Sequence, residues 1–322
     1  MEQYYSPKDM FLWDSWFALK GNECHAFHLQ APITEDPEER HNNNVSIGHA
    51  VSTDLKNWTR LPTALRPGLE DSWDNFSLWT GCVIEKDKKF YMFYTGRNKN
   101  PDVKWIQKIG IATSDDLINW EKHDKNPILE ADNEVYEMRN GKNRVGKIGA
   151  WRDPYVFRDP KTDKYYMLIT AREKGDTDEY NGCIGIAESD DILNWNLLPP
   201  LLAPGVYDEM EVPQMIIHNN LYYLFFSTQA GNYKPEYAKE VGSFGGRHCY
   251  YSETLFGEYK PVNGNASVYN HEDELYGLAA ISKNKNVLTS IGWLNKDPSG
   301  KFVGRLSHPI ELEINHDRIT VR

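Results

Sequence analysis

The sequence lacks the features that would assign it to several common classes of protein. No stretch of 18 apolar residues occurs in the 322-residue chain, so there is no candidate transmembrane helix. The opening residues, MEQYYSPKDM, show neither the basic nor the apolar region of a signal peptide. We therefore expect a cytoplasmic protein with no membrane association, unless a leader has been trimmed, in which case it is secreted.

Cysteine, positive charge and nucleotide-binding motifs are also scarce. The four cysteines form no CxxC pair, and each lies in an apolar stretch, which predicts buried free thiols rather than a zinc site. The net charge of −11 is the opposite of what a nucleic-acid partner requires. A glycine-rich phosphate loop and a GxSxG motif are both missing. No metal site and no cofactor are expected, and the acidic segment KGDTDEYNG from Lys174 is only a weak signal for a structural calcium.

What the sequence does contain is an internal repeat. Three segments share the pattern I-G-x-A-x-S-x-D-x-x-x-W from Ile47, Ile109 and Ile184, and their glycines lie 62 and 75 residues apart. A weaker fourth copy, RHCYYSETLFGEYKPV, begins at Arg247. We interpret the aspartates and tryptophans of the pattern as structural residues that hold a turn and pack between repeats. These residues are Asp54, Asp116, Asp191, Trp58, Trp120 and Trp195.

Each repeat is preceded by two further strand candidates, separated by turn-forming segments such as DPKTDK. A fifth pair, LYGLAAISK and NVLTSIGWL, follows near the C-terminal end. Four strands in a unit of this length are typical of a β-propeller blade, and five units use up the 322 residues. The sequence predicts an all-β, five-bladed β-propeller with four antiparallel strands per blade, as one catalytic domain over residues 1–322. A β-sandwich with chance similarity is the alternative.

Acidic residues occur in three of the strands that would line the central channel, which the first strand of each blade faces. Asp14 lies in that strand of blade 1, Asp153 in that of blade 3 and Glu211 in that of blade 4. Like charges brought together in apolar strands disfavour folding and raise at least one pKa, so equivalent placement in three blades indicates a functional site. Blades 2 and 5 offer Trp79 and Tyr276.

Two carboxyl groups that face one cavity are what glycosidic bond cleavage needs. One must be protonated to assist the leaving oxygen, and the other must be ionised to attack the anomeric carbon or to activate water. Nearby anions stabilise the oxocarbenium-like transition state. The aromatic content of 13% fits a sugar site, because flat rings stack on sugar faces. This reasoning identifies the acids but does not assign their individual roles.

The motifs WDSW from Trp13, WTG from Trp79, WRDP from Trp151 and DEME from Asp208 resemble those of the fructan-active propeller enzymes of glycoside hydrolase families 32 and 68, which share a clan. WDSW and DExE are more similar to family 68, the levansucrase group, and RDP is common to both. The resemblance extends from Trp13 to Tyr276. It implies a retaining enzyme of the β-fructofuranosidase type that cleaves sucrose or short β-fructosides through a covalent glycosyl-enzyme intermediate.

The resemblance also implies roles for individual residues. Asp14 would be the nucleophile, Asp153 the stabiliser of the transition state, and Glu211 the general acid and then the general base. The partner would be a small saccharide, and the residues implied to bind it are Trp13, His28, Trp79, Arg152, Glu209, Gln229, Arg247 and Tyr276.

Two positions depart from the pattern of these families. Gln229 stands where family 68 usually has an arginine that meets the sugar, and we expect Arg247 to compensate. Val212 follows the acid where family 68 has arginine and family 32 usually has cysteine. These departures leave open the sugar, the linkage, and the balance between hydrolysis and transfer. The alternatives are a related propeller glycosidase on another sugar, such as an arabinofuranoside, and a non-catalytic carbohydrate-binding propeller.

Two long loops are expected to rim the pocket and to set its specificity, since loops on a rigid scaffold often carry specificity. They cover residues 34–44 and 130–149. The sequence gives no information on oligomeric state.

Overall fold

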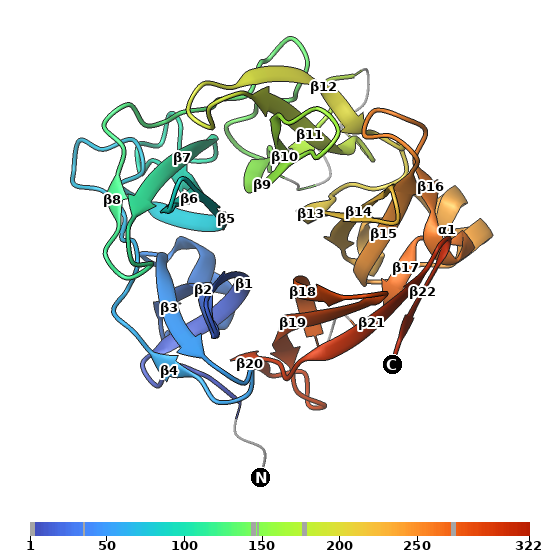
Figure 1. Ribbon diagram of the computed structural model, residues 1–322. Coiled ribbons are helices and arrows are strands. Elements are labelled where there is room, and N and C mark those ends of the chain that lie inside the picture. Colours follow the sequence, from blue (N-terminus) through green and yellow to red (C-terminus); the bar gives the residue numbers. More distant parts are fainter. Residues whose placement is uncertain (1–3, 35, 143–145, 147, 176–178, 272–274) are drawn as a thin grey trace.

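The computed structural model describes residues 4–34, 36–142, 146, 148–175, 179–271 and 275–322. Across these residues the strands form five antiparallel sheets, arranged as a ring around a common axis (Figure 1). The predicted five-bladed β-propeller with four strands per blade is confirmed, and the fourth and fifth blades each pair with one additional short strand.

The blades follow one another along the chain. Blade 1 contains β1 (Met10–Lys20), β2 (Glu23–Pro32), β3 (Ser46–Ser52) and β4 (Thr59–Arg60). Blade 2 contains β5 (Ser77–Lys86), β6 (Lys89–Arg97), β7 (Gln107–Ser114) and β8 (Glu121–Lys122). Blade 3 contains β9 (Trp151–Arg158), β10 (Tyr165–Arg172), β11 (Gly182–Ser189) and β12 (Asn196–Leu202).

Blade 4 contains β13 (Glu211–His218), β14 (Leu221–Thr228), β15 (Gly246–Ser252), β16 (Lys260–Pro261) and the short β17 (Ser267–Tyr269). Blade 5 contains β18 (Leu275–Asn284), β19 (Val287–Lys296), β20 (Phe302–Leu306), β21 (Ile310–Asn315) and β22 (Arg318–Val321). The helices are short: η1 (Pro37–Asn42), η2 (Ala230–Asn232), α1 (Pro235–Val241) and η3 (Val262–Gly264). The innermost strands are β1, β5, β9, β13 and β18 (Figure 1).

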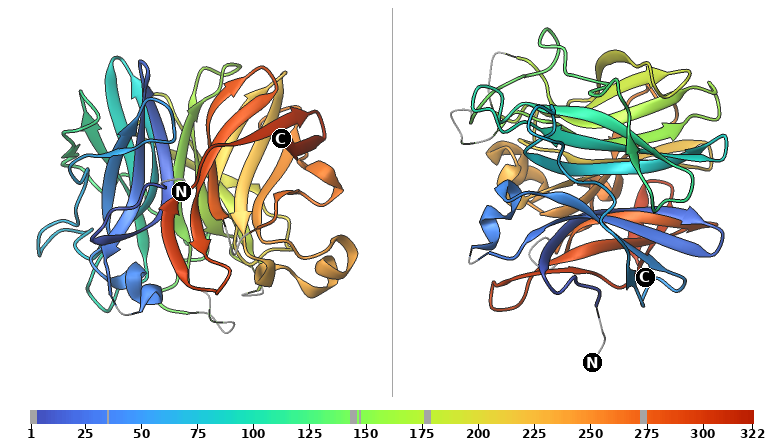
Figure 2. Two further views of the ribbon diagram at one scale, coloured as in Figure 1. Left: turned by 90° about the horizontal axis from the view of Figure 1, so that it is seen from below. Right: turned by 90° about the vertical axis from the view of Figure 1, so that its left-hand side faces the viewer.

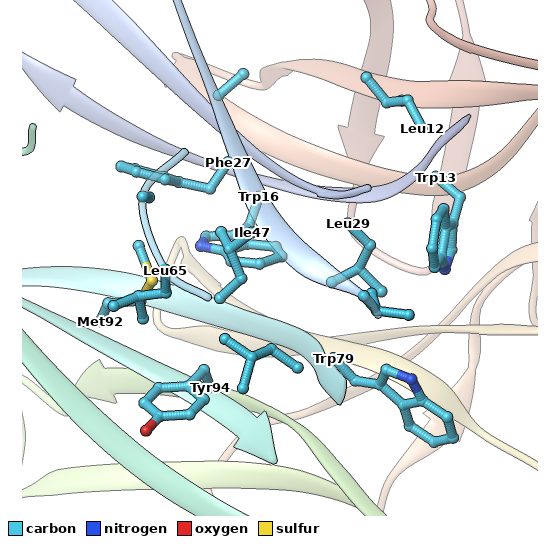
Figure 3. Packing of buried hydrophobic residues seen from close by; sticks show 14 of the residues in the cluster. Leu12, Trp13, Trp16, Phe27, Leu29, Ile47, Leu65, Trp79, Met92 and Tyr94 are labelled. Atoms are coloured by element: carbon cyan, nitrogen blue, oxygen red, sulfur yellow. The ribbon is translucent and has the colours of Figure 1, made fainter. Parts of the chain in front are cut away.

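Apolar side chains of neighbouring blades pack against each other and form the core. Phe27 and Ile47 of blade 1 share one cluster with Met92 of blade 2, and all three are fully buried (Figure 3). Trp13 and Trp79 lie at the edge of the same cluster, on the side that faces the channel. The tryptophans near the site are therefore held in place by core packing.

The repeated S-x-D turns have the structural role that was predicted for them. Oδ1 of Asp54 accepts hydrogen bonds from the backbone N–H groups of Lys56 and Asn57, at 2.9 and 2.7 Å. The same pair of contacts recurs at Asp116 and Asp191. These carboxylates therefore satisfy turn N–H groups that would otherwise lack a protein partner.

Two of the three repeat tryptophans pack between blades, as predicted. The Trp120 ring of blade 2 meets Phe27 of blade 1 edge-on, with 5.7 Å between ring centroids. The Trp195 ring of blade 3 meets Phe93 of blade 2 in the same way at 5.8 Å. The nearest aromatic ring to Trp58 belongs to its own blade. The repeat tryptophans of blades 2 and 3 thus each contact the preceding blade, whereas Trp58 belongs to the first blade of the chain.

The ring is closed by contacts between the first and last blades. The backbone N–H of Leu306 in β20 donates to the carbonyl of Tyr5 at 3.0 Å, and the Phe11 and Phe302 rings meet edge-on at 5.4 Å. The four cysteines are buried and unbonded, which confirms the predicted free thiols. In the described part of the chain, no helix has the length and apolarity needed to cross a membrane.

Candidate active site

A β-bulge interrupts the innermost strand of every blade at the same level. In the pairing of β1 with β2, Trp13 lies opposite Leu29 and Ser15 lies opposite His28, so Asp14 has no residue opposite it on β2. The innermost strands of the other blades show the same register shift, between positions 79 and 81, 152 and 155, 211 and 214, and 276 and 279. Because a bulge re-aims side chains locally, adjacent residues of each strand can both face the channel.

The bulges create two rings of residues around the channel. The first ring, just before the bulges, is Trp13, Trp79, Arg152, Glu211 and Tyr276. The second ring, at the bulges, is Asp14, Thr80, Asp153, Val212 and Gly277. All of these except Gly277 line one cavity of about 300 Å³, together with Glu209.

The two rings correct one detail of the sequence prediction. Asp14 and Asp153 do occupy equivalent positions, but Glu211 lies one residue earlier in its strand, in the first ring. The reason is that the bulge of blade 4 begins at Val212, so that Glu211 still pairs, with Ser227.

The backbone is strained at the bulges of blades 3 and 4. Asp153 and Val212 have φ angles of +57° and +45°, in the left-handed region that non-glycine residues rarely adopt. In blade 5 the same position is Gly277, at φ +59°, which glycine tolerates. Such strain costs on the order of 1–3 kcal/mol per residue and is concentrated at functional sites.

Arg152 connects three of the acidic side chains. Its Nη2 donates to Oε1 of Glu211 at 2.9 Å and to Oε1 of Glu209 at 3.3 Å. Its Nε lies 3.7 Å from Oδ2 of Asp153. Arg172 adds a second cation on Glu209, at 3.1 Å. The guanidinium thus compensates part of the negative charge that the channel brings together.

Asp14 is held by neutral donors. Oδ1 accepts from the indole Nε1 of Trp293 at 2.9 Å, and Oδ2 accepts from the hydroxyl of Thr80 at 3.4 Å. Burial, followed by the charges of Asp153 and Glu211, raises the pKa of Asp14 to about 7. This carboxyl is therefore poised to change its charge near neutral pH.

Glu211 lies between a cation and a hydroxyl. Its Oε2 accepts from the Tyr276 hydroxyl at 2.7 Å, and its Oε1 accepts from Arg152. Burial and the charge of Glu209 raise the pKa of Glu211, while Arg152 opposes that shift. A raised pKa is what a carboxyl group needs to keep a proton for transfer.

Asp153 is fixed by three contacts to one oxygen. Its Oδ2 accepts from the Thr170 hydroxyl at 2.9 Å and from the backbone N–H of Val212 at 3.2 Å, and it faces Arg152. Burial raises its pKa, and these donors lower it. Its other oxygen, Oδ1, is not engaged by these contacts.

A second cavity of about 340 Å³ adjoins the first and shares Trp13, Asp14, Glu211 and Tyr276 with it. Gln229, a predicted sugar-binding residue, lines this outer cavity. Figure 2 shows η1 (blue) and α1 (orange) at one end of the propeller, and η1 contributes lining residues to both cavities.

Both rim loops contribute to the site, as predicted. His41 and Asn42 come from the loop 34–44, and Gly146 and Ile148 come from the loop 130–149. The sequence analysis did not single out these residues individually. It also missed Thr80, Arg40 and Trp293, although Thr80 directly follows the predicted Trp79.

His28 does not line either of these cavities. It lies on the second strand of blade 1, is fully buried, packs against Tyr5, and places Nδ1 3.2 Å from the Leu29 carbonyl. The prediction that His28 faces the sugar is therefore wrong in position, because it is on β2 rather than on the inner strand.

Arg247 is also placed differently from the expectation. It lies on β15, the third strand of blade 4, and lines a third cavity of about 240 Å³. This cavity shares Thr80, Asp153 and Val212 with the first but lies on the other side of the bulges. Gln229 occupies the outer cavity in place of the usual arginine, and Arg247 does not reach that cavity. Its guanidinium instead donates to the backbone carbonyl of Val212.

The acidic segment in which a calcium was weakly indicated spans 174–182, and residues 176–178 fall outside the described residues. In the rest of the described chain, no group of three or more His, Cys, Asp or Glu side chains is placed to hold a metal ion. The expectation of no cofactor stays a prediction.

The class of protein follows from the arrangement: a propeller whose channel presents two perturbed carboxyl groups, with a third acid and an arginine beside them, has the layout of a glycoside hydrolase. A model of the glycosyl hydrolases family 32 N-terminal domain matches residues 16–321, and the chain belongs to this family. The match begins after Asp14, so the position of that residue is established here by the structure.

Individual relatives agree with this membership. A levansucrase of Zymomonas mobilis is 29% identical over 89% of this chain and 74% of its own. An extracellular sucrase of the same organism is 28% identical over 95% of this chain and 83% of its own. The solved structure of an inulosucrase from Halalkalicoccus jeotgali bound to kestose superposes with a TM-score of 0.81 at 25% identity, over 99% and 90% of the two chains. The predicted resemblance to the clan of families 32 and 68 is confirmed.

Proposed function

We propose that this protein is a retaining glycoside hydrolase of the β-fructofuranosidase type, which cleaves sucrose or short β-fructosides and also transfers fructosyl units. The observation that carries the proposal is the meeting of Asp14 and Glu211 in one cavity, beside Asp153 and Arg152. Relatives named levansucrase, extracellular sucrase and inulosucrase favour a fructoside as the substrate.

In the first step, Glu211 gives its proton to the glycosidic oxygen while a carboxylate oxygen of Asp14 bonds to the anomeric carbon of the fructosyl unit. The bond to the leaving sugar breaks, and that sugar departs with the proton. In the second step, Glu211, now ionised, takes a proton from water or from the hydroxyl of an acceptor sugar. The oxygen attacks the anomeric carbon and releases Asp14 as a carboxylate.

Asp153 and Arg152 act on the sugar without forming a bond to it. Asp153 is fixed through Oδ2, which leaves Oδ1 to accept hydrogen bonds from sugar hydroxyls that strengthen in the transition state. Arg152 holds Glu211 and Glu209 in place. Trp13 and Trp79 form apolar walls of the cavity that exclude water from the reacting carbon.

The charges of the three acids are coupled. Asp14, Asp153 and Glu211 repel one another, so they titrate as a group, and one retains a proton at weakly acidic pH while the others ionise. When Asp14 ionises, its charge is stabilised by the Trp293 N–H. We expect a bell-shaped pH dependence of kcat/KM with its maximum on the acidic side of neutrality.

The outer cavity, with Gln229 and η1, is the place for the leaving sugar and the acceptor, because it shares Asp14 and Glu211 with the inner cavity. The predicted cytoplasmic location stays a prediction. A relative named extracellular sucrase favours secretion instead, and fractionation of the native host decides between the two.

The test is product analysis on a panel that includes sucrose, inulin-type oligosaccharides and an arabinofuranoside. Carbon-13 NMR of the anomeric C2 of the first product distinguishes the anomers, and retention requires β-fructofuranose. Asp14→Asn and Glu211→Gln should each abolish sucrose cleavage, while Asp190→Asn, an exposed turn acid outside the cavities, should keep it. Cleavage of the arabinofuranoside in preference to sucrose, or an inverted product, would overturn the proposal.

A further inference from the structure

The fourth blade departs from the repeat at one buried position. Each residue of the first ring is paired with a residue of the second strand, which in turn is paired with one of the third strand. In blades 1, 2 and 3 this third-strand residue is Ile47, Ile109 or Ile184, and none of them has any exposed surface. Strand pairing places Arg247 at the same position in blade 4, with 3% of its surface exposed. A cation has taken the place of a core isoleucine.

This substitution is unfavourable for folding alone. Within the described part of the chain, the hydrogen bonds of the guanidinium all go to neutral oxygens: the Val212 carbonyl at 2.9 Å, Oε1 of Gln214 at 3.2 Å and the Ser227 hydroxyl at 3.5 Å. It also lies over the Phe225 ring, 5.5 Å from the centroid, but no carboxylate among the described residues accepts from it. Burial lowers the pKa of Arg247 to about 10. A buried charge without a carboxylate partner costs more than an apolar residue of similar size. Stability of the fold therefore does not explain why this position is an arginine.

The partner of Arg247 supplies that reason. Val212 is β-branched and has φ +45°, which is a true outlier for such a residue. In this conformation its N–H points at Asp153 while its carbonyl points back at Arg247, at 3.2 and 2.9 Å respectively. The two contacts flank the same Cα, so together they fix both backbone torsions of Val212.

The arginine is itself anchored across a blade boundary. Gln214, the second acceptor of Arg247, receives a hydrogen bond from the Ala280 N–H at 2.9 Å and donates to the Ala280 carbonyl at 2.8 Å. The planar fork of a guanidinium can hold two acceptors in fixed geometry. Blade 5 thus fixes Gln214, which orients Arg247, which orients Val212.

We propose that Arg247 is a positioning residue that holds the bulge of blade 4 in its strained form. It thereby aims the Val212 N–H at Asp153 and the Glu211 side chain at the cavity. The inference rests on the proposed function, because it assigns Arg247 to the same reaction without contact to the substrate.

The test uses Arg247→Ile, which introduces the residue that blades 1, 2 and 3 carry at this position. We expect stability to urea that equals or exceeds that of the wild type, because an apolar residue replaces a buried charge. We expect kcat to fall by about 10- to 100-fold with KM little changed, since small displacements of catalytic groups cost that much. Ile109→Val, at the same position in blade 2, is the matched control and should leave kcat unchanged.

A double variant then isolates the mechanism. Glycine adopts positive φ without steric cost, so Val212→Gly added to Arg247→Ile should recover most of the lost kcat. Arg247→Lys should stay impaired, because an ammonium keeps the charge but loses the two-pronged geometry. Should Arg247→Ile fail to fold, Gln214→Met, which removes the anchor, takes its place in the same scheme.

Three results would each overturn the inference: an Arg247→Ile enzyme with kcat within about twofold of wild type, a loss that Val212→Gly does not relieve, or full rescue by lysine. The kcat values are compared on whichever glycoside the wild-type protein hydrolyses. A protein that does not cleave sucrose would therefore refute the proposed substrate without deciding the role of Arg247. A crystal structure of Arg247→Ile checks the φ of Val212 independently of activity.

Discussion

Replacement of Asp14 by Asn should abolish turnover and, at the same time, make the folded protein more resistant to urea above neutral pH. Asparagine has nearly the same shape, and its Oδ1 can still accept the hydrogen bond from Trp293, so the packing should survive. What disappears is a negative charge that the fold places beside Asp153 and Glu211. The nucleophile of the proposed reaction is thus also a site of instability.

The magnitude follows from the pKa of Asp14, which rises from 3.8 to about 7. Roughly three pKa units at about 1.4 kcal/mol each give an upper bound of about 4 kcal/mol. The carboxyl borders an open cavity and shares the repulsion with two other acids, so we expect about 1–2 kcal/mol. The folded-state pKa of Asp14 lies above the unfolded one, so this group does not change the free energy of unfolding of the wild type below about pH 4. Its destabilising effect grows as the pH rises towards 7 and is constant at higher pH.

The assay is urea unfolding of wild type and Asp14→Asn between pH 4 and 8, followed by tryptophan fluorescence. The stability difference should be small at the acidic end and grow until about pH 7. Asp54→Asn is the control of opposite sign, because turn N–H groups lower the pKa of Asp54, so its contribution is present at neutral pH and lost on acidification. A stability difference for Asp14→Asn that does not change with pH, or an active variant, would refute the reasoning.

Three further predictions concern the site and its frame. Glu211→Gln should lower kcat on sucrose by about 10²–10⁴-fold, with less loss on substrates whose leaving group needs no proton, and should remove the alkaline limb of the pH profile. Trp79→Ala should raise KM more than it lowers kcat, because the ring forms a wall of the binding cavity. Isothermal titration calorimetry with a fructoside product measures the expected loss of affinity. Asp116→Ala should cost about 1 kcal/mol in urea unfolding, comparable to the loss of a helix cap, with unchanged kcat.

The sequence was sufficient to predict the fold because the repeat encodes it directly. The pattern around Ile47, Ile109 and Ile184 marks the third strand of three blades, and their aspartates cap the same turn each time. The acids in the inner strands could be found for a related reason: Asp14 and Asp153 contradict their apolar surroundings, and a folding argument does not account for them.

The finer layout could not be predicted, because it depends on register. A bulge shifts strand pairing by one residue without a clear signal in composition, so the expected equivalence of Glu211 with Asp14 and Asp153 is off by one residue. The family resemblance implied His28 at the sugar, and Arg247 was expected there to compensate for Gln229, but their strands are the second and third of a blade. Their distance from the channel is a matter of position across the sheet, which spacing along the chain does not report.

The ring of bulges has a consequence for the way such a pocket can change. Thr80 and Val212 lie where the strand ladder is interrupted, so neither has a regular cross-strand partner that a new side chain would disrupt. Their replacement should alter the shape and polarity of the cavity while each blade keeps its pairing. A library that varies these two positions, with the acids kept, should therefore sample new sugar specificities at little cost in folding yield.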